Sequence, residues 1–368
     1  MKIPANDLSA QIAPLKDRLR EAFDRVLESG WFLGGPEVAA FEKEFTAFAD
    51  TGFTVACSSG TDALVLALKA LGLSPGDEII MPSHTAPPCY HAALAAGCLP
   101  VFAEIDEFCC IDPESVRAVA GPKTRAVLAV HLYGQPCEME ELTEVCKEKG
   151  LFIIEDCAQA HGALYNGTAV GAFGDLAAFS FYPTKNLGAL GDGGAVCGKN
   201  HELEEKLRSI KQYGETKRYE SGMPGLNSRM DEMQAAFLRE RLSRVGRELA
   251  RREWLADLYS QRLSNSPVQV PSVRPGCLHG WHLYTIRAPK REKLIKHLAG
   301  KGIGTAVHYP IPGHKQPMFT KGKIPFKAGK LKRSEAVAEE ILSLPFYSEI
   351  NKEDVRTVCD AINEFYGT

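Results

Sequence analysis

Short apolar runs alternate with amphipathic stretches between about residues 53 and 200. Seven runs rich in Val, Ile, Phe and Ala have the composition of buried strands: 53–57, 78–82, 100–104, 125–131, 151–155, 176–181 and 194–197. Between them, 61–71 and 138–149 carry apolar residues at helical spacing. The alternation predicts an α/β fold in which helices cover both faces of a mostly parallel seven-stranded sheet.

The two ends of the chain have different patterns. Segments 12–29 and 38–50 are predicted helices, and 231–263 is predicted to be one long charged helix. Beyond residue 267 we expect strands at 281–287 and 304–309 and helices at 291–300, 334–342 and 352–366. The chain is therefore predicted to form a large domain, 1–245, and a small C-terminal α/β domain, 246–368.

The amino-acid composition excludes several classes of protein but does not identify the function. The 368 residues are 45% hydrophobic and 24% charged, and the formal net charge is −3. These values are typical of a globular protein and give no sign of a nucleic-acid partner. No apolar run has the length of a membrane span, and the N-terminus lacks a signal-peptide core. We expect a cytoplasmic enzyme with no membrane partner.

Eleven cysteines, an odd number, include no C-x-x-C pair. Neither a disulfide framework nor a thiolate zinc site is favoured by such a pattern. Metal could be considered only at Cys109-Cys110 and in the run from Cys277 to His282, where the ligand spacing is irregular. We expect no metal site.

A phosphate site is suggested by Cys57-Ser-Ser-Gly60-Thr61, where a predicted strand ends, a turn follows and a helix begins. Free N–H groups at a helix start, with the Thr61 hydroxyl and the helix dipole, suit an anion. A helix N-cap without any ligand would produce the same pattern, because Ser and Thr are preferred there.

Asp156 ends another predicted strand, in Glu155-Asp-Cys-Ala-Gln159-Ala-His161. A carboxylate beside a pyridine nitrogen keeps that ring protonated and able to accept electrons. Gln159 could then hydrogen-bond the phenolic oxygen of such a ring, and His161 could support Asp156 from behind. Alternatively, Asp156 simply caps the following helix.

Lys185 follows the strand at 176–181 and precedes a glycine-rich turn that ends at Gly194. A partly desolvated lysine has a lowered pKa and can form a Schiff base with an aldehyde. Ser180 could add a hydroxyl to the phosphate site. Phosphate turn, ring-nitrogen acid and Schiff-base lysine, each at a strand end, together predict pyridoxal 5′-phosphate (PLP) as the cofactor.

With these residues in place, the chain resembles the DegT/DnrJ/EryC1/StrS sugar aminotransferases, PLP enzymes of the aspartate-aminotransferase fold (fold type I). The resemblance runs almost the whole length and rests on six ordered motifs: Gly30-Trp-Phe-Leu-Gly, Ser59-Gly-Thr-Asp-Ala-Leu, Glu155-Asp-Cys-Ala-Gln-Ala-His-Gly162, Tyr182-Pro-Thr-Lys-Asn-Leu-Gly, 225–236 and Val307-His-Tyr-Pro310.

The resemblance implies further site residues. Asn227 matches a residue that reaches the cofactor phosphate of a neighbouring subunit, which implies a homodimer with shared active sites. His308 and Tyr309 match a segment close to the sugar nucleotide. Tyr182, Lys217 and Tyr219 are assigned to the substrate on the same basis, the last two within a loop that closes over it.

The resemblance also implies a reaction, ping-pong transfer of an amino group from glutamate through the Lys185-bound cofactor. The segments 185–194 and 227–229 are most similar to enzymes that aminate C3 of a nucleotide-linked 3-keto-6-deoxyhexose. Amination at C4, or of a keto-inositol or free keto sugar, stays open. Ala86 stands where many relatives stack an aromatic ring on the cofactor; either His84 or Tyr90 supplies that face, or the site is more open.

Three other functions compete with this one. A C3 deoxygenase of the same family would carry histidine in place of Lys185. A non-catalytic regulator could keep the fold, although it would have no need of Asp156 and Lys185. A nicotinamide dehydrogenase would require G-x-G-x-x-G after the first strand, and Cys57-Ser-Ser-Gly60-Thr61 lacks it.

Overall fold

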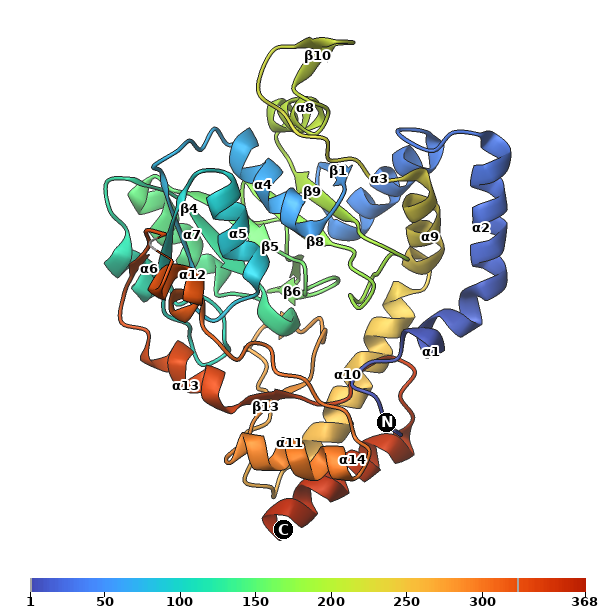
Figure 1. Cartoon of the computed structure of the whole chain (residues 1–368), viewed down its shortest axis with the longest axis vertical. Helices are drawn as coiled ribbons and strands as arrows, with labels where there is room; N and C mark the ends of the chain where they lie inside the picture. The colour runs from blue at the N-terminus through green and yellow to red at the C-terminus, as the bar shows by residue number, and fades with distance from the viewer. Residues whose placement is uncertain (1, 323) are drawn as a thin grey trace.

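The computed structural model describes residues 2–322 and 324–368. A large sheet with helices on both faces makes up one lobe, and the long helix α10 (Val245–Arg262) leads from it to a smaller lobe. Both chain ends lie at this smaller lobe (Figure 1). We call the elements around the large sheet the large lobe, and those around the core beside α10 the small lobe.

The large lobe is built on an eight-stranded sheet in the order β1-β9-β8-β5-β4-β2-β3-β14. Its strands are β1 (Phe53–Cys57), β2 (Glu78–Pro82), β3 (Leu99–Ala103), β4 (Thr124–Val130), β5 (Phe152–Asp156), β8 (Leu176–Ser180), β9 (Gly194–Gly198) and β14 (Lys327–Ala328). β9 runs antiparallel to β1 and β8, and the other neighbours are parallel. The predicted α/β class and mostly parallel sheet are confirmed.

Alternate residues of one strand enter different cores, which shows that both faces of the sheet are covered. In β4, Leu128 packs in the core beneath α4, α5 and α8, while Val127 and Ala129 pack in the core beneath α6 and α7. The helices of this lobe are α1 (Leu8–Ile12), α2 (Lys16–Ser29), α3 (Pro36–Ala49), α4 (Gly60–Ala70), α5 (Pro87–Ala95), α6 (Pro113–Val119), α7 (Met139–Lys149), α8 (His201–Ile210) and α9 (Glu232–Leu242), with 3₁₀ turns η1 (Ala13–Leu15) and η2 (Leu132–Gly134).

An eighth strand corrects the predicted count of seven. β14 comes from the C-terminal part of the chain and pairs in parallel with the outer edge of β3. Its Lys327 Nζ lies 2.5 Å from Glu78 Oε1. A two-residue strand carries too little periodicity to be recognised in the sequence.

The predicted single helix over 231–263 is wrong. The structure has α9 and α10, separated at Ser243 and Arg244, where the Ser243 hydroxyl donates to the Glu240 carbonyl. Ser and Gly have weak helical preference, and Gly246 follows at once. The break turns the chain from the large lobe into the small one.

The C-terminal part of the chain also departs from prediction. Its elements are β13 (Thr285–Arg287), α11 (Arg291–Gly300), η3 (Gly313–Lys315), α12 (Pro317–Thr320), α13 (Lys332–Glu340), β15 (Ile341–Ser343) and α14 (Lys352–Tyr366). The strand predicted at 281–287 starts late, because Trp281 has φ of 44°. The strand predicted at 304–309 is wrong: the segment makes one isolated bridge, between Ala306 and Ser343, and Pro310 cannot donate to a ladder.

Two segments cross the division proposed at residue 245. Ile3 packs in the small-lobe core with Leu255 and Val358, while Phe319 and Leu331 pack in the large-lobe core. Three short elements, β6 (Leu164–Tyr165), β7 (Thr168–Ala169) and β12 (Cys277–Leu278), form a separate sheet. The boundary 1–245 and 246–368 stays a prediction.

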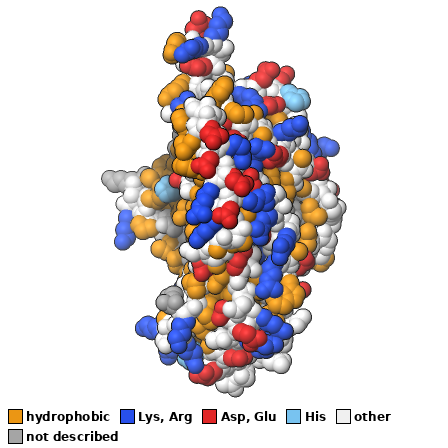
Figure 2. Space-filling model, turned by 90° about the vertical axis from the view of Figure 1, so that its right-hand side faces the viewer, with side chains coloured by type: hydrophobic (Ala, Val, Ile, Leu, Met, Phe, Trp, Pro, Cys, Tyr) orange, Lys and Arg blue, Asp and Glu red, His pale blue; other side chains and the backbone are white. Residues whose placement is uncertain are grey.

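A hairpin of β10 (Glu215–Lys217) and β11 (Glu220–Ser221) stands away from the rest of the molecule, above α8 (Figure 1). Among the described residues, none of the helices is both long and apolar enough to span a bilayer. On the face drawn in Figure 2, basic and acidic side chains are interspersed and no single sign dominates.

Candidate active site

A cavity of about 250 Å³ lies at the carboxyl ends of β4, β5 and β8. Its wall includes the start of α4 and, from the C-terminal part of the chain, Tyr309. Ligands of open α/β sheets bind at this edge, since strand ends and helix N-termini converge there. Eight of the predicted site residues line the cavity: Gly60, Thr61, Asp156, Gln159, Ser180, Tyr182, Lys185 and Tyr309.

The α4 end of the cavity is shaped by close backbone approach. Ser59 is the N-cap of α4, and its hydroxyl accepts from Asp62 N at 3.1 Å. A Cβ placed on Gly60 would lie 2.5 Å from Ser180 Cβ and 2.9 Å from Ser180 Oγ. Gly60 therefore lets the helix start and the Ser180 hydroxyl face the same small volume, which suits an anion held by N–H and O–H donors.

Asp156 is the last residue of β5 and is buried. Its Oδ1 accepts from Ala158 N at 3.0 Å, and the Cys89 thiol lies 3.4 Å from its Oδ2. Burial raises the pKa of the Asp156 carboxyl, against the Ala158 N–H and the positive charge of Lys185. A cationic ring nitrogen beside this carboxyl would stabilise its charged form.

Lys185 lies in the turn after β8 and lines the cavity. Desolvation lowers the pKa of Lys185 to about 8, with Asp156 and Cys89 opposing the shift. The side chain keeps partial access through the cavity that it lines. At neutral pH a fraction of this amine is therefore unprotonated and nucleophilic.

Glu155, next to Asp156, fixes the end of β5 from the opposite side. Its carboxylate accepts from the backbone N–H groups of Gly171, Phe173 and Gly174 at 2.7–2.8 Å. His131 Nε2 also lies 3.0 Å from it, while His131 Nδ1 accepts from Cys137 N. Together with Cys157, these side chains offer three possible metal ligands within 4.8 Å, but hydrogen bonds already occupy the carboxylate, and we assign the group a bracing role.

His161 does not hydrogen-bond Asp156, contrary to the support we expected. Neither of its ring nitrogens has a partner among the described residues. The ring packs against Phe45, Phe179 and Phe181. Burial lowers the pKa of His161 to about 3, so the ring is neutral. His161 therefore packs as a neutral ring among these three phenylalanines and does not line the cavity.

Gln159 and Tyr309 meet inside the cavity. Gln159 Nε2 donates to the Tyr309 hydroxyl at 3.1 Å, and Gln159 Oε1 accepts from Tyr133 N at 2.7 Å. The amide orientation is thereby fixed, and one Nε2 hydrogen is left to point elsewhere. Tyr133 was not anticipated from the sequence; its one signal was a Tyr-Gly pair directly after a predicted strand.

Other predicted residues lie at different distances from the cavity. His308 borders a neighbouring cavity of about 190 Å³ with Thr184, and its Nδ1 lies 2.8 Å from Ser343 Oγ. Asn227 is exposed, and its Oδ1 accepts from Arg229 Nε at 3.0 Å. Lys217 and Tyr219 lie on the protruding hairpin, where Tyr219 is 83% exposed. Neither hairpin residue nor Asn227 lines the cavity of its own chain.

Part of the cavity wall is aliphatic. Ala86, Pro87 and Pro88 line it, whereas His84 and Tyr90 are buried and do not line it. His84 Nε2 instead lies 2.7 Å from the Tyr133 hydroxyl. Of the alternatives drawn from the sequence, the more open site agrees with this geometry.

These residues fit PLP. The helix start and Ser180 match a phosphate, the buried Asp156 matches the ring nitrogen, and the Lys185 amine matches the aldehyde. A Cβ at Gly60 would collide with Ser180, so glycine is required for the helix start to approach the Ser180 hydroxyl this closely. With the cofactor bound there, Asp156, Lys185, Gly60, Thr61 and Ser180 are its candidate contacts.

Known proteins resemble the chain over its whole length. It is 44% identical over 366 residues to dTDP-3-amino-3,4,6-trideoxy-α-D-glucose transaminase from Streptomyces venezuelae, covering 99% of this chain and 96% of that one. It is 41% identical to a pleiotropic regulatory protein from Geobacillus stearothermophilus, covering 100% and 99%. The crystal structure of S. venezuelae DesV with a ketimine intermediate superposes with a TM-score of 0.96, at 44% identity and over 100% and 99% of the two chains.

The family model described as the DegT/DnrJ/EryC1/StrS aminotransferase family matches residues 14–363. This range contains the strand ends, the start of α4 and Tyr309, so the whole candidate site falls within the match. The resemblance drawn from six sequence motifs is therefore confirmed. The chain belongs to the DegT/DnrJ/EryC1/StrS aminotransferase family.

Proposed function

We propose that the protein transfers an amino group from glutamate to C3 of a nucleotide-linked 3-keto-6-deoxyhexose, with PLP held on Lys185. The observation that carries this is the buried Lys185 amine beside Asp156 at the strand ends. The nitrogen moves from the glutamate Cα to the sugar C3. The keto oxygen of the sugar leaves as water, and the keto oxygen of 2-oxoglutarate comes from water, so the overall transfer balances. The 44% identity to a 3-amino-sugar transaminase supports C3.

Bound PLP would supply an electron sink for the carbon that loses or gains a proton. Burial raises the pKa of Asp156, and a neighbouring cation would lower it again and favour the ionised carboxylate. The ionised carboxylate would in turn hold the ring nitrogen protonated. The Lys185 amine, with a pKa of about 8, is able to take and return that proton near neutral pH. The start of α4 and Ser180 would anchor the phosphate.

The absorption spectrum of the purified protein tests the cofactor and the first half of the reaction together. We expect a visible band from the lysine-bound cofactor that glutamate bleaches while 2-oxoglutarate forms in equal amount. Aspartate and alanine serve as comparison donors. A protein that stays colourless with added PLP would contradict the proposal.

The sugar is tested by supplying nucleotide-linked 3-keto and 4-keto hexoses, a keto-inositol and a free keto sugar to the glutamate-treated protein. Return of the visible band reports amine transfer, and mass spectrometry with NMR assigns the aminated carbon. We expect the 3-keto sugar nucleotide to react fastest. Faster reaction of the 4-keto sugar or the keto-inositol would overturn the C3 assignment and leave the transfer itself intact.

We further propose a homodimer that shares its sites across the interface. Exposed apolar side chains gather at the start of α9: Trp31, Phe32, Leu33 and Leu190. Phe32 O accepts from Glu232 N at 3.0 Å, and Leu190 N donates to Gln234 Oε1 at 2.9 Å. Monomers rarely leave such a patch in water. Asn227, five residues before the first residue of α9, is exposed on the same stretch of chain.

Sharing is tested by mixing two inactive variants, Lys185→Ala and Asn227→Ala, after brief dissociation and reassociation. A mixed dimer has one site with both residues intact, so activity should return toward a quarter of wild type for random pairing. Sedimentation measures the dimer itself. Two variants that dimerise together and yet stay inactive would contradict the role of Asn227 across the interface.

A regulatory role is the second candidate, because one relative with 41% identity is named a pleiotropic regulatory protein. A regulator needs the fold but not a nucleophilic lysine. The glutamate test separates the two: bleaching with 2-oxoglutarate release supports the enzyme, and binding of PLP without any reaction supports the regulator.

A further inference from the structure

Tyr133 joins four separate segments of the chain. Its backbone N–H donates to Gln159 Oε1 at 2.7 Å, and its carbonyl accepts from His282 N at 2.8 Å. Its hydroxyl donates to the His308 carbonyl and lies 2.7 Å from His84 Nε2. Two of these segments, those of His84 and Gln159, follow strands of the large sheet, and the other two belong to the C-terminal part of the chain.

The backbone of Tyr133 is strained to make these contacts. Its φ is 61° and its ψ is −3°, a left-handed conformation that few residues with a bulky side chain adopt. Such strain persists where the surroundings determine the residue completely, and it concentrates at functional sites. All the polar groups of Tyr133 are engaged, so the surroundings do determine it.

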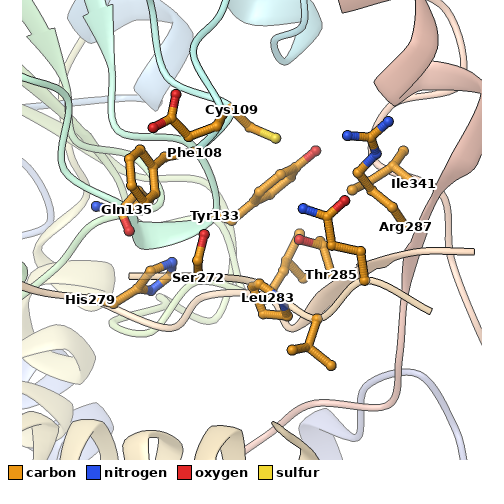
Figure 3. Close-up of a pocket in the computed structure, with 14 residues that line it drawn as sticks. Phe108, Cys109, Tyr133, Gln135, Ser272, His279, Leu283, Thr285, Arg287 and Ile341 are labelled. Atoms are coloured by element: carbon orange, nitrogen blue, oxygen red, sulfur yellow. The ribbon is translucent and has the colours of Figure 1, made fainter. Parts of the chain in front are cut away.

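The ring of Tyr133 also forms part of the junction between the lobes. It lines a cavity of about 40 Å³ with Leu283, Thr285 and Arg287 from the small lobe and Cys109 from the large lobe (Figure 3). This cavity has room for a very few water molecules and none for a substrate. The ring therefore lies where side chains of the two lobes meet.

Tyr309 is fixed from both ends by groups that Tyr133 holds. The carbonyl of the preceding residue, His308, accepts from the Tyr133 hydroxyl. The Tyr309 hydroxyl accepts from Gln159, whose other amide atom accepts from the Tyr133 N–H. The rest of the segment is held by the Ala306–Ser343 bridge and by His308 Nδ1 beside Ser343 Oγ, so the bonds to Gln159 and Tyr133 are the ones that act on Tyr309 from the cavity side.

We propose that Tyr133 is a positioning residue, which sets the place of Tyr309 and Gln159 in the cofactor cavity without touching the reacting atoms. This inference rests on the proposed aminotransferase function for its kinetic consequence. Its structural part, the restraint of the segment 304–311, stands independently of any reaction. A misplacement of about 1 Å of such groups can slow a reaction by up to about 100-fold.

The test compares Tyr133→Phe with Tyr259→Phe. Tyr259 is also fully buried and donates to a backbone carbonyl, that of Pro345, at 2.8 Å, but it lies in the small-lobe core. Each variant keeps the ring and loses one phenol–carbonyl hydrogen bond, and Tyr133→Phe also loses the contact of the hydroxyl with His84 Nε2. We expect hydrogen exchange of the peptide spanning 304–311 to quicken about threefold or more in cofactor-free Tyr133→Phe, and to stay unchanged in Tyr259→Phe.

Steady-state kinetics test whether Tyr133 acts through Tyr309. For Tyr133→Phe we expect kcat to fall about tenfold with little change in the glutamate KM. The double variant Tyr133→Phe/Tyr309→Phe should be no slower than the slower single variant, because both changes remove one restraint. Multiplying effects, or an equal loss in Tyr259→Phe, would overturn the proposal.

The two proposals fail in different ways. If the wild-type protein does not react with glutamate, the aminotransferase function fails, and the hydrogen-exchange comparison still tests the restraint. If the wild-type protein reacts and Tyr133→Phe matches it in both exchange and kcat, the positioning role is wrong.

Discussion

The two sides of the cofactor cavity are built in different ways. On the sheet side, Asp156 and Ser180 end strands whose backbones are fixed by neighbouring strands, and Gly60 starts a capped helix. On the other side, Tyr309 lies on an irregular segment held by side-chain hydrogen bonds from Gln159 and Tyr133. Sheet ladders place a residue through many cooperative bonds, whereas the second arrangement depends on a few.

This contrast separates two kinds of function. Groups whose chemistry depends on accurate position, an acid and a nucleophile, lie on the sheet side. On the irregular side, Tyr309 is placed by side-chain hydrogen bonds and by packing against the large-lobe core, with no strand ladder to fix its backbone. Substitutions on the sheet side should therefore abolish the reaction, and substitutions on the irregular side should change its rate.

The largest effect is expected from Lys185→Ala, which removes the amine on the sheet side. We expect kcat to fall by about 1,000-fold or more, since both covalent attachment and proton transfer are lost. Steady-state release of 2-oxoglutarate measures it. Lys199→Ala is the control: Lys199 follows β9 and donates to the Ala172 carbonyl at 2.9 Å outside the cavity. Turnover within tenfold of wild type would refute the assignment of Lys185.

Gly60→Ala should act on cofactor binding. Its new Cβ would come within 2.5 Å of Ser180 Cβ, so the helix start and Ser180 must separate. We expect the Kd for PLP to rise by about 10- to 100-fold, as phosphate donors lose alignment. Gly246→Ala, where no atom lies within 4 Å of the added carbon, is the matched control. Fluorescence titration of cofactor-free protein gives both constants; equal constants would argue against a phosphate site at α4.

The depressed pKa of Lys185 predicts a pH dependence of stability without cofactor. The folded lysine loses its proton near pH 8, while the unfolded one keeps it until about pH 10.5. The unfolded state therefore binds more protons in this window, and wild type should gain stability relative to Lys185→Met as pH rises from about 8 to 10.5.

We expect this gain to be about 2 kcal/mol, less than the full shift implies because water enters the cavity. Urea denaturation of both proteins at several pH values measures it. A constant difference between the two proteins across the window would mean that Lys185 has an ordinary pKa.

The smallest effect is expected from Tyr309→Phe on the irregular side. The ring still lines the cavity, and one hydrogen bond from Gln159 is lost. We expect kcat to fall about five- to tenfold and PLP affinity to stay within about twofold. Stopped-flow bleaching by glutamate separates the two quantities. A loss as large as that of Lys185→Ala would erase the contrast between the two sides.

The same contrast explains what the sequence could predict. Strands of the large sheet are buried on both faces and so appear as continuous apolar runs, and the residues that end them, Asp156 and Ser180, could be located from those runs. The order of phosphate turn, acid and lysine then indicated the cofactor. This side of the cavity follows from local patterns along the chain.

The irregular side could not be derived in that way. The segment at 304–309 alternates like a strand but is held by bonds to residues distant in the sequence, among them Ser343 and Tyr133. Tyr133 itself needed a left-handed backbone that glycine more often supplies. The resemblance to a family pointed to His308 and Tyr309, and their partners required the structure.

The two-residue strand β14 has a consequence for how the chain is made. It covers the outer edge of β3, and residue 327 leaves the ribosome more than 220 residues after β3 does. Until then, the nascent sheet presents an unpaired edge of the kind that joins other chains into aggregates. We therefore expect the unfinished chain to be more prone to association through this edge until β14 emerges, although every residue that lines the cavity is already present by then.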